Sequence, residues 1–477
     1  MFFLTFSLFF LSSLFDILLL VIQMIPLSNE ELYKAINKEN QTIEKFREAN
    51  PQFKIDLTNV ASTLKEIEYF EHLYSHMGIG CFEFSPSDFN FKRTDTYTFQ
   101  QIFSDNFYSF LEDNPSINIR PIVIEEVEKM LTCQDPDYGH AIYECPNCHK
   151  THIVPFTCKS RFCNTCAIKY QMDRALEITS KLIRCEHRHV VFTIPEQLRI
   201  FFIRDRHLLD ILFKAVEECI KYIFKKRAPK KKYTPGVILV LHTFGRDLKF
   251  NPHIHCLITE GASSNIKNCT TDDIWINFTH FNYEAFRKSF QYSLLKYMKK
   301  YLKETLSPKE FTEFQQIVDF LYANYDNGFY VRAKPFEGKS NDGAVRYLLR
   351  YFNRPAMAQS PILYYDGTYV VFYYQRHEDD MYVVEKGHVY DLIKRLIIHI
   401  PEKNFKMLRY AGLYSSHKCA HFDKLIKKLS DIAIQTRKSL ANWRVRIQMA
   451  FHYDPLICPS CHSTMTFSEI VIAKKSS

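Results

Sequence analysis

Pairs of cysteines separated by two residues constrain the fold of this chain more than any other feature. Two such pairs, Cys145–Cys148 and Cys163–Cys166, lie about fifteen residues apart in the runs CPNC and CNTC. Four thiolates at this spacing match a tetrahedral structural zinc site, and they indicate a reducing compartment rather than disulfide bonds. Cys158 and two histidines lie between the pairs and could replace one ligand or serve a second ion. We therefore predict a zinc-binding module.

Cys458 and Cys461 form a third pair near the C-terminus. Alone they supply two ligands, so two more would have to come from elsewhere in the chain. The ligand-type residues considered for that role are Cys419, His417, His421 and His462. The sequence leaves open whether this pair binds a metal.

A second pattern joins two segments about ninety residues apart. The run NPHIHCLITEG carries His253 and His255 and is typical of a strand, whereas GAVRYLLRYFNRP carries Tyr347 and Tyr351 and is typical of a helix. Side chains at i and i+2 of a strand point to one side, and those at i and i+4 of a helix share one face. A histidine pair able to hold a divalent cation, together with two phenols, is suited to breaking a DNA strand through a covalent phosphotyrosine.

Each half of this pattern has a structural alternative. A His-x-His strand can be a hydrogen-bonded structural pair, and tyrosines four residues apart on a helix often belong to an apolar core. The run FTIP, residues 192–195, favours the functional interpretation because it has the form of a buried strand that would pair with a histidine strand. His242 is a candidate third ligand, since a hard cation that keeps waters usually has another one; it could equally be a packed strand residue.

With 477 residues the chain is too long for one core, and we expect two to four domains. Its hydrophobic fraction of 46% and charged fraction of 24% are typical of a folded protein. The order of strands and helices, with a hairpin between residues 236–244 and 253–259, indicates an α+β fold rather than a doubly wound sheet. The expected units are an apolar extension (1–23), a helical region (24–140), the zinc module (141–185), the histidine and tyrosine domain (186–356) and a C-terminal α/β region (357–477).

Residues 1–23 are almost entirely apolar, and Asp16 is their one charged residue. A run of this length could span a membrane, but it lacks the basic start and the cleavage site of a signal peptide. The preferred interpretation is a mis-assigned start or a passenger extension, and a membrane anchor is the alternative. We expect the protein in the cytoplasm, associated with the nucleoid.

The formal net charge of +9 is compatible with a polyanionic partner but does not establish one. Positive charge concentrates in the run FKKRAPKKKY, which holds Lys230, Lys231 and Lys232 directly before the histidine strands. Such a run is either a solvated loop or a contact to a phosphate backbone. Lys159 and Arg161 of the zinc module are further candidates for DNA contact.

Taken in order, these motifs resemble a known family. FTIP, LHTFGRDLKFNPHIHCLITEG and RYLLRYFNRP resemble the HUH-type rolling-circle transposases of bacterial insertion sequences, in the branch with two tyrosines. YECPNCHKTHIVPFTCKSRFCNTC resembles that family's N-terminal zinc domain, and LRYAGLYSS and DPLICPSCHSTM resemble its C-terminal region. The resemblance extends from roughly Glu125 to Thr466. It implies an antiparallel HUH nuclease sheet of the ferredoxin or RRM type, with flanking helices and a preceding zinc module.

The resemblance also implies roles for the matching residues. His253 and His255 would coordinate Mg²⁺ or Mn²⁺, with His242 as the candidate third ligand. Tyr347 and Tyr351 would each attack a phosphodiester and leave a 5′-phosphotyrosine and a free 3′-hydroxyl, so that resealing needs no ATP. Basic residues beside the tyrosines would either clamp phosphates or form a solvated helix edge: Arg346, Arg350 and Arg354.

Asn251 departs from the family pattern, which commonly has a histidine there, and we place this position outside the catalytic pair. The expected partners are single-stranded DNA of the element ends and the target, with zinc and Mg²⁺ or Mn²⁺ but no small-molecule cofactor; a homodimer is left open. Two other functions share most of these features. One is a plasmid replication initiator or relaxase with the same chemistry, and the other is a non-catalytic, zinc-dependent DNA-binding relic of a mobile element.

Overall fold

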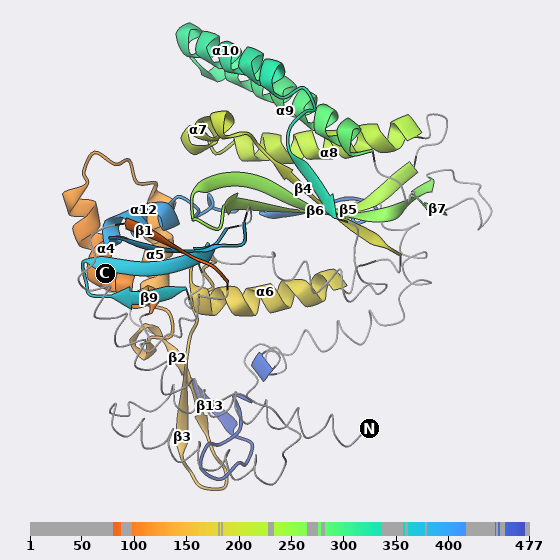
Figure 1. Cartoon of the computed structure of the whole chain (residues 1–477). Coiled ribbons are helices and arrows are strands. Elements are labelled where there is room, and N and C mark those ends of the chain that lie inside the picture. The colour runs from red at the N-terminus through yellow and green to blue at the C-terminus, as the bar shows by residue number, and fades with distance from the viewer. Residues whose placement is uncertain are drawn as a thin grey trace, which may run out of the picture.

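The strands in the described part of this protein lie in three separate antiparallel sheets, with helices packed on two of them (Figure 1). The α+β class predicted from the sequence is confirmed. Within the described part of the chain, no helix is both long and apolar enough to span a membrane. The computed structural model describes residues 80–86, 98–179, 182, 185–227, 233–264, 275–277, 282–334, 356–357, 361–376, 379–415, 444, 447–448 and 454–472. The apolar residues 1–23 lie outside these ranges.

The largest sheet has six strands, and the histidine motif lies on its middle strands. Its order is β12–β5–β6–β4–β8, with β7 added to the far part of β6. The strands are β4 (His187–Thr193), β5 (Tyr233–Phe244), β6 (Phe250–Ser264), β7 (Trp275–Asn277), β8 (Val331–Lys334) and β12 (Leu408–Gly412). β5 and β6 form the predicted hairpin, and β4, which contains the start of the FTIP run, pairs with the other side of β6 as expected.

The two faces of this sheet differ in what covers them. On one face lie helices α7 (Glu196–Arg204), α8 (Leu208–Arg227) and α9 (Tyr283–Thr305), and α10 (Pro308–Asn324) packs against α9 (Figure 1). Ile254, between the two histidines, is fully buried in that core, which is the alternation expected of a strand. The opposite face carries the histidines and lies over α6 (Asn164–Thr179), whose Ile178 packs with Val240 and Leu257.

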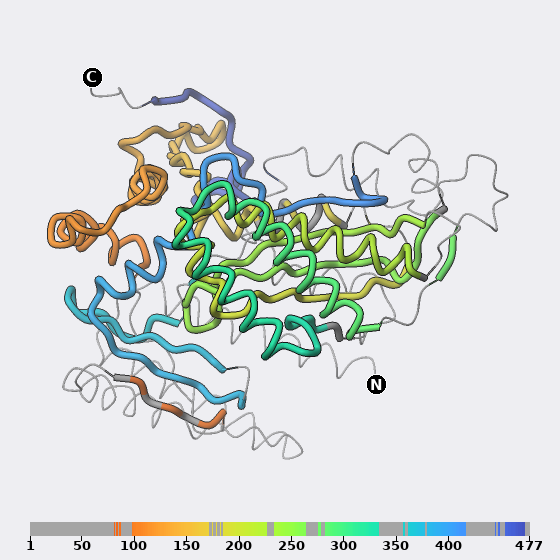
Figure 2. Tube along the Cα trace, turned by 90° about the horizontal axis from the view of Figure 1, so that it is seen from above, coloured from red at the N-terminus to blue at the C-terminus, as the bar shows by residue number. Residues whose placement is uncertain are grey.

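A four-stranded sheet lies beside the six-stranded one rather than beneath it (Figure 2). Its order is β1–β11–β10–β9, and its strands are β1 (Gly80–Phe84), β9 (Ile362–Tyr365), β10 (Tyr369–Gln375) and β11 (Tyr382–His388). Three helices build a phenylalanine-rich core with it: α4 (Phe99–Asp113), α5 (Pro121–Leu131) and α12 (Val389–Ile397). This core includes Cys163 and Cys166, so it connects directly to the cysteine-rich module.

The third sheet is small and combines distant segments. β2 (His140–Glu144) and β3 (Thr151–Pro155) form a hairpin, and β13 (Thr466–Val471) pairs with β2 from the C-terminal region (Figure 1). The sheets therefore combine strands from different predicted units. β12 and β13 both come from the expected C-terminal region, but β12 pairs with β5 of the histidine sheet and β13 pairs with β2 of the zinc module. Strand pairing over such distances leaves no local trace in sequence.

Candidate metal centre and cysteine clusters

Three histidines meet on the face of the six-stranded sheet that lies over α6. His242 on β5 stands opposite His253 on β6, and His255 follows on the same face. Their ligand nitrogens all lie within 4.8 Å of one another, and the Nε2 atoms of His253 and His255 are 3.1 Å apart. His242 and His255 are buried, whereas His253 is half-buried. The structure thus brings the histidine pair together with its candidate third ligand.

Hydrogen bonds on the far side of two rings fix which nitrogen faces the centre. The Nδ1 atom of His253 lies 2.7 Å from the carbonyl oxygen of Asn251, and because that oxygen can only accept, Nδ1 carries the proton and Nε2 keeps its lone pair. The Nδ1 atom of His255 lies 2.9 Å from Nε2 of His189 on β4. Histidines that bind metals are usually held by such outer partners. Asn251 thus contributes through its backbone.

Burial favours the neutral forms of His255 and His189. It is the main cause that lowers the pKa of His255 well below its ordinary value, and the neighbouring His242 and His253 lower that pKa further. The pKa of His189 falls to about 4, first through burial and then through the charges of His253 and Arg332. A neutral imidazole keeps a lone pair for a metal, so the donor set fits a divalent cation with open positions left for water or substrate.

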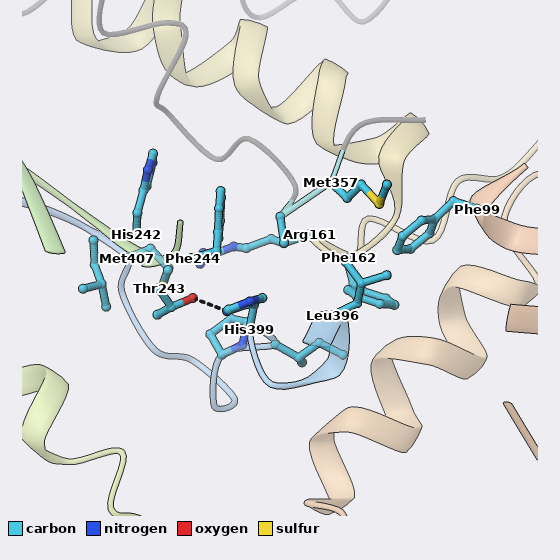
Figure 3. Close-up of a pocket in the computed structure, with 14 residues that line it drawn as sticks. Phe99, Arg161, Phe162, His242, Thr243, Phe244, Met357, Leu396, His399 and Met407 are labelled. Atoms are coloured by element: carbon cyan, nitrogen blue, oxygen red, sulfur yellow. Dashed lines mark hydrogen bonds between the residues drawn. The ribbon is translucent and has the colours of Figure 1, made fainter. Parts of the chain in front are cut away.

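A pocket opens beside His242, and its wall includes Arg161, Met357 and His399 (Figure 3). His399 links two neighbouring segments through its ring. Its Nε2 atom lies 2.9 Å from the Leu248 carbonyl oxygen, and its Nδ1 atom lies 3.1 Å from the Thr243 hydroxyl. The carbonyl oxygen can only accept, so Nε2 donates to it and Nδ1 accepts from the hydroxyl.

Arg161, predicted as a DNA contact, is half-buried in this wall. Its guanidinium donates to the Phe405 carbonyl over 3.4 Å and lies over the Tyr170 ring at 5.4 Å from the centroid. Lys159, the other predicted contact of this module, is exposed.

The predicted nucleophiles and most of the predicted basic contacts lie outside the described residues. They are Tyr347, Tyr351, Arg346, Arg350, Arg354, Lys230, Lys231 and Lys232. The described residues on either side of the tyrosine segment, however, are close to the histidines. The backbone of Lys334 pairs with His189, and Ala356 and Met357 line the pocket beside His242.

Eight of the described cysteines form two groups of four, and in each group the sulfur atoms lie within 4.8 Å of one another. The first group is Cys133, Cys158, Cys163 and Cys166, and the second is Cys145, Cys148, Cys458 and Cys461. The single four-thiolate site predicted from Cys145, Cys148, Cys163 and Cys166 is therefore wrong. The β2–β3 hairpin explains why. The pair Cys145–Cys148 lies in the turn of this hairpin, whereas Cys163–Cys166 follows its opposite end.

The first group has the contacts of a metal-binding turn. The Sγ atom of Cys166 lies 3.6 Å from that of Cys133 and 3.5 Å from that of Cys158, and backbone N–H groups of Cys158 and Ser160 donate to the sulfurs of Cys133 and Cys158. Contacts with Cys133 and the other thiols hold the pKa of Cys166 far below its usual range. α6 begins inside this group, so a zinc ion held here would fix the helix that lies under the histidine face.

Two family models match the chain. One described as "Putative transposase" matches residues 236–421, and one described as "Transposase zinc-binding domain" matches residues 102–194. The chain belongs to the two-tyrosine, HUH-type family of insertion-sequence transposases.

Two curated relatives match most of this transposase. The "Transposase for insertion sequence element IS801" of Pseudomonas savastanoi pv. phaseolicola is 26% identical over 360 residues, which cover 74% of this chain and 85% of that protein. The "Putative transposase y4qJ" of Sinorhizobium fredii (strain NBRC 101917 / NGR234) is 23% identical over 354 residues, with coverage of 69% and 84%. No solved structure matches the chain.

The two family models cover the candidate functional residues of this transposase unevenly. The transposase model spans the three histidines and both tyrosines, and the zinc-binding model spans the first cysteine group. Cys458 and Cys461 lie outside both models. Sequence reasoning missed Cys133, which has no cysteine partner at knuckle spacing, and His189, which stands in HRHVVFT as an ordinary strand residue. The i, i+2 repeat of His187 and His189 was the one signal available for the latter.

Proposed function

We propose that this transposase cuts and rejoins single DNA strands through 5′-phosphotyrosine intermediates in a rolling-circle type of transposition. The observation that carries the proposal is the convergence of His242, His253 and His255 on one sheet face. Burial lowers the pKa of His255, and the Nε2 lone pair of His253 faces the centre. Histidines that only fill a core have no need to place three ring nitrogens close enough to bind one metal ion. The membership in a transposase family supports DNA as the substrate.

The described residues that flank the tyrosine segment support the same conclusion. Its described flanks, Lys334 and Ala356, lie at the two sides of the histidine centre. A chain spans at most about 3.3–3.6 Å per residue. Tyr351 is five residues before Ala356 and is therefore held within about 18 Å of it. The same limit holds Tyr347, nine residues before Ala356, within about 32 Å.

The chemistry divides between the residues as follows. His242, His253 and His255 would hold Mg²⁺ or Mn²⁺, which supplies positive charge that polarises the scissile phosphate. The phenolic oxygen of Tyr347 or Tyr351 attacks phosphorus in line, the bond from phosphorus to the 3′ oxygen breaks, and a 5′-phosphotyrosine forms. The phenolic proton passes to a base or water, and the released 3′ oxygen takes up a proton. Because the phosphodiester bond energy is kept in the new ester, the reverse attack by a 3′-hydroxyl reseals a strand.

The test is covalent capture of DNA by the full chain. End-labelled single-stranded DNA carrying the element end, taken from the sequence that flanks the reading frame, is incubated with protein and Mn²⁺ or Mg²⁺. We expect an adduct that survives denaturation and is absent from the double variant Tyr347→Phe/Tyr351→Phe and from His253→Ala. Tyr222→Phe, which removes an exposed hydroxyl from α8 on the other side of the sheet, is the matched control and should form the adduct normally.

The outcomes separate the alternatives. Binding of every end sequence without an adduct would contradict the proposal and favour a non-catalytic DNA-binding protein. An adduct that forms on a replication or transfer origin but on neither element end would identify an initiator or relaxase. An adduct that persists in the double tyrosine variant would refute the assignment of the nucleophiles.

A further inference from the structure

Two turns far apart in the chain have the same sequence pattern and the same backbone geometry. One is Cys145-Pro-Asn-Cys148-His149, and the other is Cys458-Pro-Ser-Cys461-His462. In both turns the histidine has a positive φ, 54° and 58°, and its N–H donates over 2.9 Å to the carbonyl of the first cysteine. The N–H of each first cysteine in turn donates to the residue after the histidine, at 3.0 and 2.9 Å. Each turn is therefore a complete metal-binding knuckle that presents two sulfurs.

The two knuckles face each other with their sulfurs at the spacing of a tetrahedral site. The Sγ atom of Cys461 lies 3.3 Å from that of Cys145 and 3.5 Å from that of Cys148, and Cys458 lies 3.6 Å from Cys148. Bonds of about 2.3 Å to a central zinc ion place tetrahedral sulfurs about 3.8 Å apart, whereas disulfide sulfurs lie about 2.05 Å apart. All four cysteines are free. A hydrogen bond of 3.0 Å from Lys150 to Ser460 also joins the two turns.

Among the described residues, few apolar contacts hold the C-terminal segment in place. Every residue of β13 is exposed, and Phe467 and Ile470 expose more than half of their surface, 56% and 55%. The buried core around the knuckles consists of the cysteines and Met465. A module with so small a core gains its folding energy from a bound metal.

We propose that Cys145, Cys148, Cys458 and Cys461 form a second structural zinc site, which fastens the C-terminal strand β13 to the β2–β3 hairpin. The zinc-binding domain of this chain is thus completed by residues 454–472, about 260 residues beyond the region that its family model matches. The chain binds two zinc ions, and the second ion links segments 310 residues apart in sequence. Four thiolates favour zinc or iron over the hard ions expected at the histidine centre.

The test is the metal content of the purified full chain, measured by mass spectrometry of the elements after exhaustive dialysis. We expect two zinc ions per chain in the wild type and one in the double variant Cys458→Ser/Cys461→Ser. Cys163→Ser/Cys166→Ser, in the first group, should also retain one. Cys81→Ser removes an exposed cysteine outside both groups and should retain two. One zinc ion in the wild type, or two in the Cys458→Ser/Cys461→Ser variant, would overturn the proposal, and so would iron in place of zinc.

A measurement on the wild type keeps the proposal testable if the cysteine variants fail to fold. The metal-free chain is titrated with Co²⁺, and we expect two equivalents to give the absorption of tetrahedral tetrathiolate cobalt. Saturation of that absorption at one equivalent would overturn the second site. Neither measurement uses DNA, and cobalt bound by the histidines does not give the tetrathiolate absorption, so a failure here is distinct from a failure of the proposed DNA chemistry.

Discussion

The Nε2 atom of His189 on β4 lies 2.9 Å from the Nδ1 atom of His255 on β6, and the two rings are nearly parallel, 11° apart. His189 does not belong to the three histidines that converge on one point. If Nδ1 of His255 donates to His189, the Nε2 atom of His255 keeps its lone pair on the side of His253. His189 then acts through His255, as a residue that orients a metal ligand.

Replacing His189 with alanine should weaken Mn²⁺ binding by about 10–100-fold, the usual effect of removing an outer partner from a ligating histidine. Isothermal titration with Mn²⁺ measures this directly. His189→Gln should restore much of the affinity, because its amide oxygen can accept the same hydrogen bond. The matched control is His187→Gln on the same strand, since His187 bonds instead to the Tyr414 hydroxyl at 2.7 Å. Equal losses of affinity in His189→Ala and His187→Gln would contradict the assigned role.

Arg332 on β8 is a further residue that the sequence did not single out. It stands beside Val191, which in turn stands beside His255, so the three side chains share one face of the sheet. Arg332 is exposed, and its charge contributes to the lowered pKa of His189. We expect it to contact a DNA phosphate next to the metal centre, where a charged hydrogen bond is worth about 1.5–3 kcal/mol.

Arg332→Ala should therefore reduce the rate of covalent adduct formation about tenfold or more. Arg332→Lys, which keeps the charge but loses the bidentate fork, should fall between alanine and the wild type. Lys309→Ala, an exposed change on α10, should have no effect. An adduct rate for Arg332→Ala equal to that of Lys309→Ala would remove Arg332 from the site.

The histidine centre was predictable from sequence because its pattern is local. His253 and His255 alternate with core residues, and a strand of known alternation places both on one face. To predict His242 it was enough to pair its strand with the histidine strand, and a hairpin is the commonest pairing of two neighbouring strands. His189 and Arg332 could not be found in this way, because β4 and β8 pair across long intervening segments.

The cysteine clusters, in contrast, were only partly predictable from the sequence. Spacing identified every knuckle correctly as a pair, but it could not say which pairs meet. Cys163 and Cys166 are completed by Cys133, which precedes the hairpin, and Cys145 and Cys148 are completed from the C-terminus. Which cysteine pairs come together depends on the β2–β3 hairpin and on the pairing of β13 with β2. The pairing of β13 is a long-range contact that no local sequence pattern indicates.

Acid should destabilise the fold through two buried histidines that do not belong to the three of the metal centre. Burial lowers the pKa values of His187 and His399 to about 4 from an unfolded value near 6.5. Between these values the unfolded chain binds more protons than the folded one, so stability is full at neutral pH and falls as the pH drops. Each histidine contributes up to about 1.4 kcal/mol per pH unit in that window.

Urea unfolding followed at pH 7.5, 6.0 and 5.0 measures this slope. His399→Gln can keep both hydrogen bonds of the ring but cannot take up the proton, so its free energy of unfolding should fall less steeply than that of the wild type. The comparison between the two proteins cancels the loss of zinc at low pH, which affects both. Identical slopes would show that His399 does not titrate on unfolding.

The two tyrosines should be separable by single variants. Two nucleophiles allow a second strand to be cut before the first is released, whereas one nucleophile permits a single transfer. We expect at least one of Tyr347→Phe and Tyr351→Phe to form an adduct with one element end, and neither to join that end to a target strand. Gel analysis of a labelled end and a differently labelled target separates the adduct from the joined product, with Tyr222→Phe on α8 as the active control. Full joining by both single variants would mean that the second phenol is not needed, and the two-nucleophile mechanism would have to be abandoned for this chain.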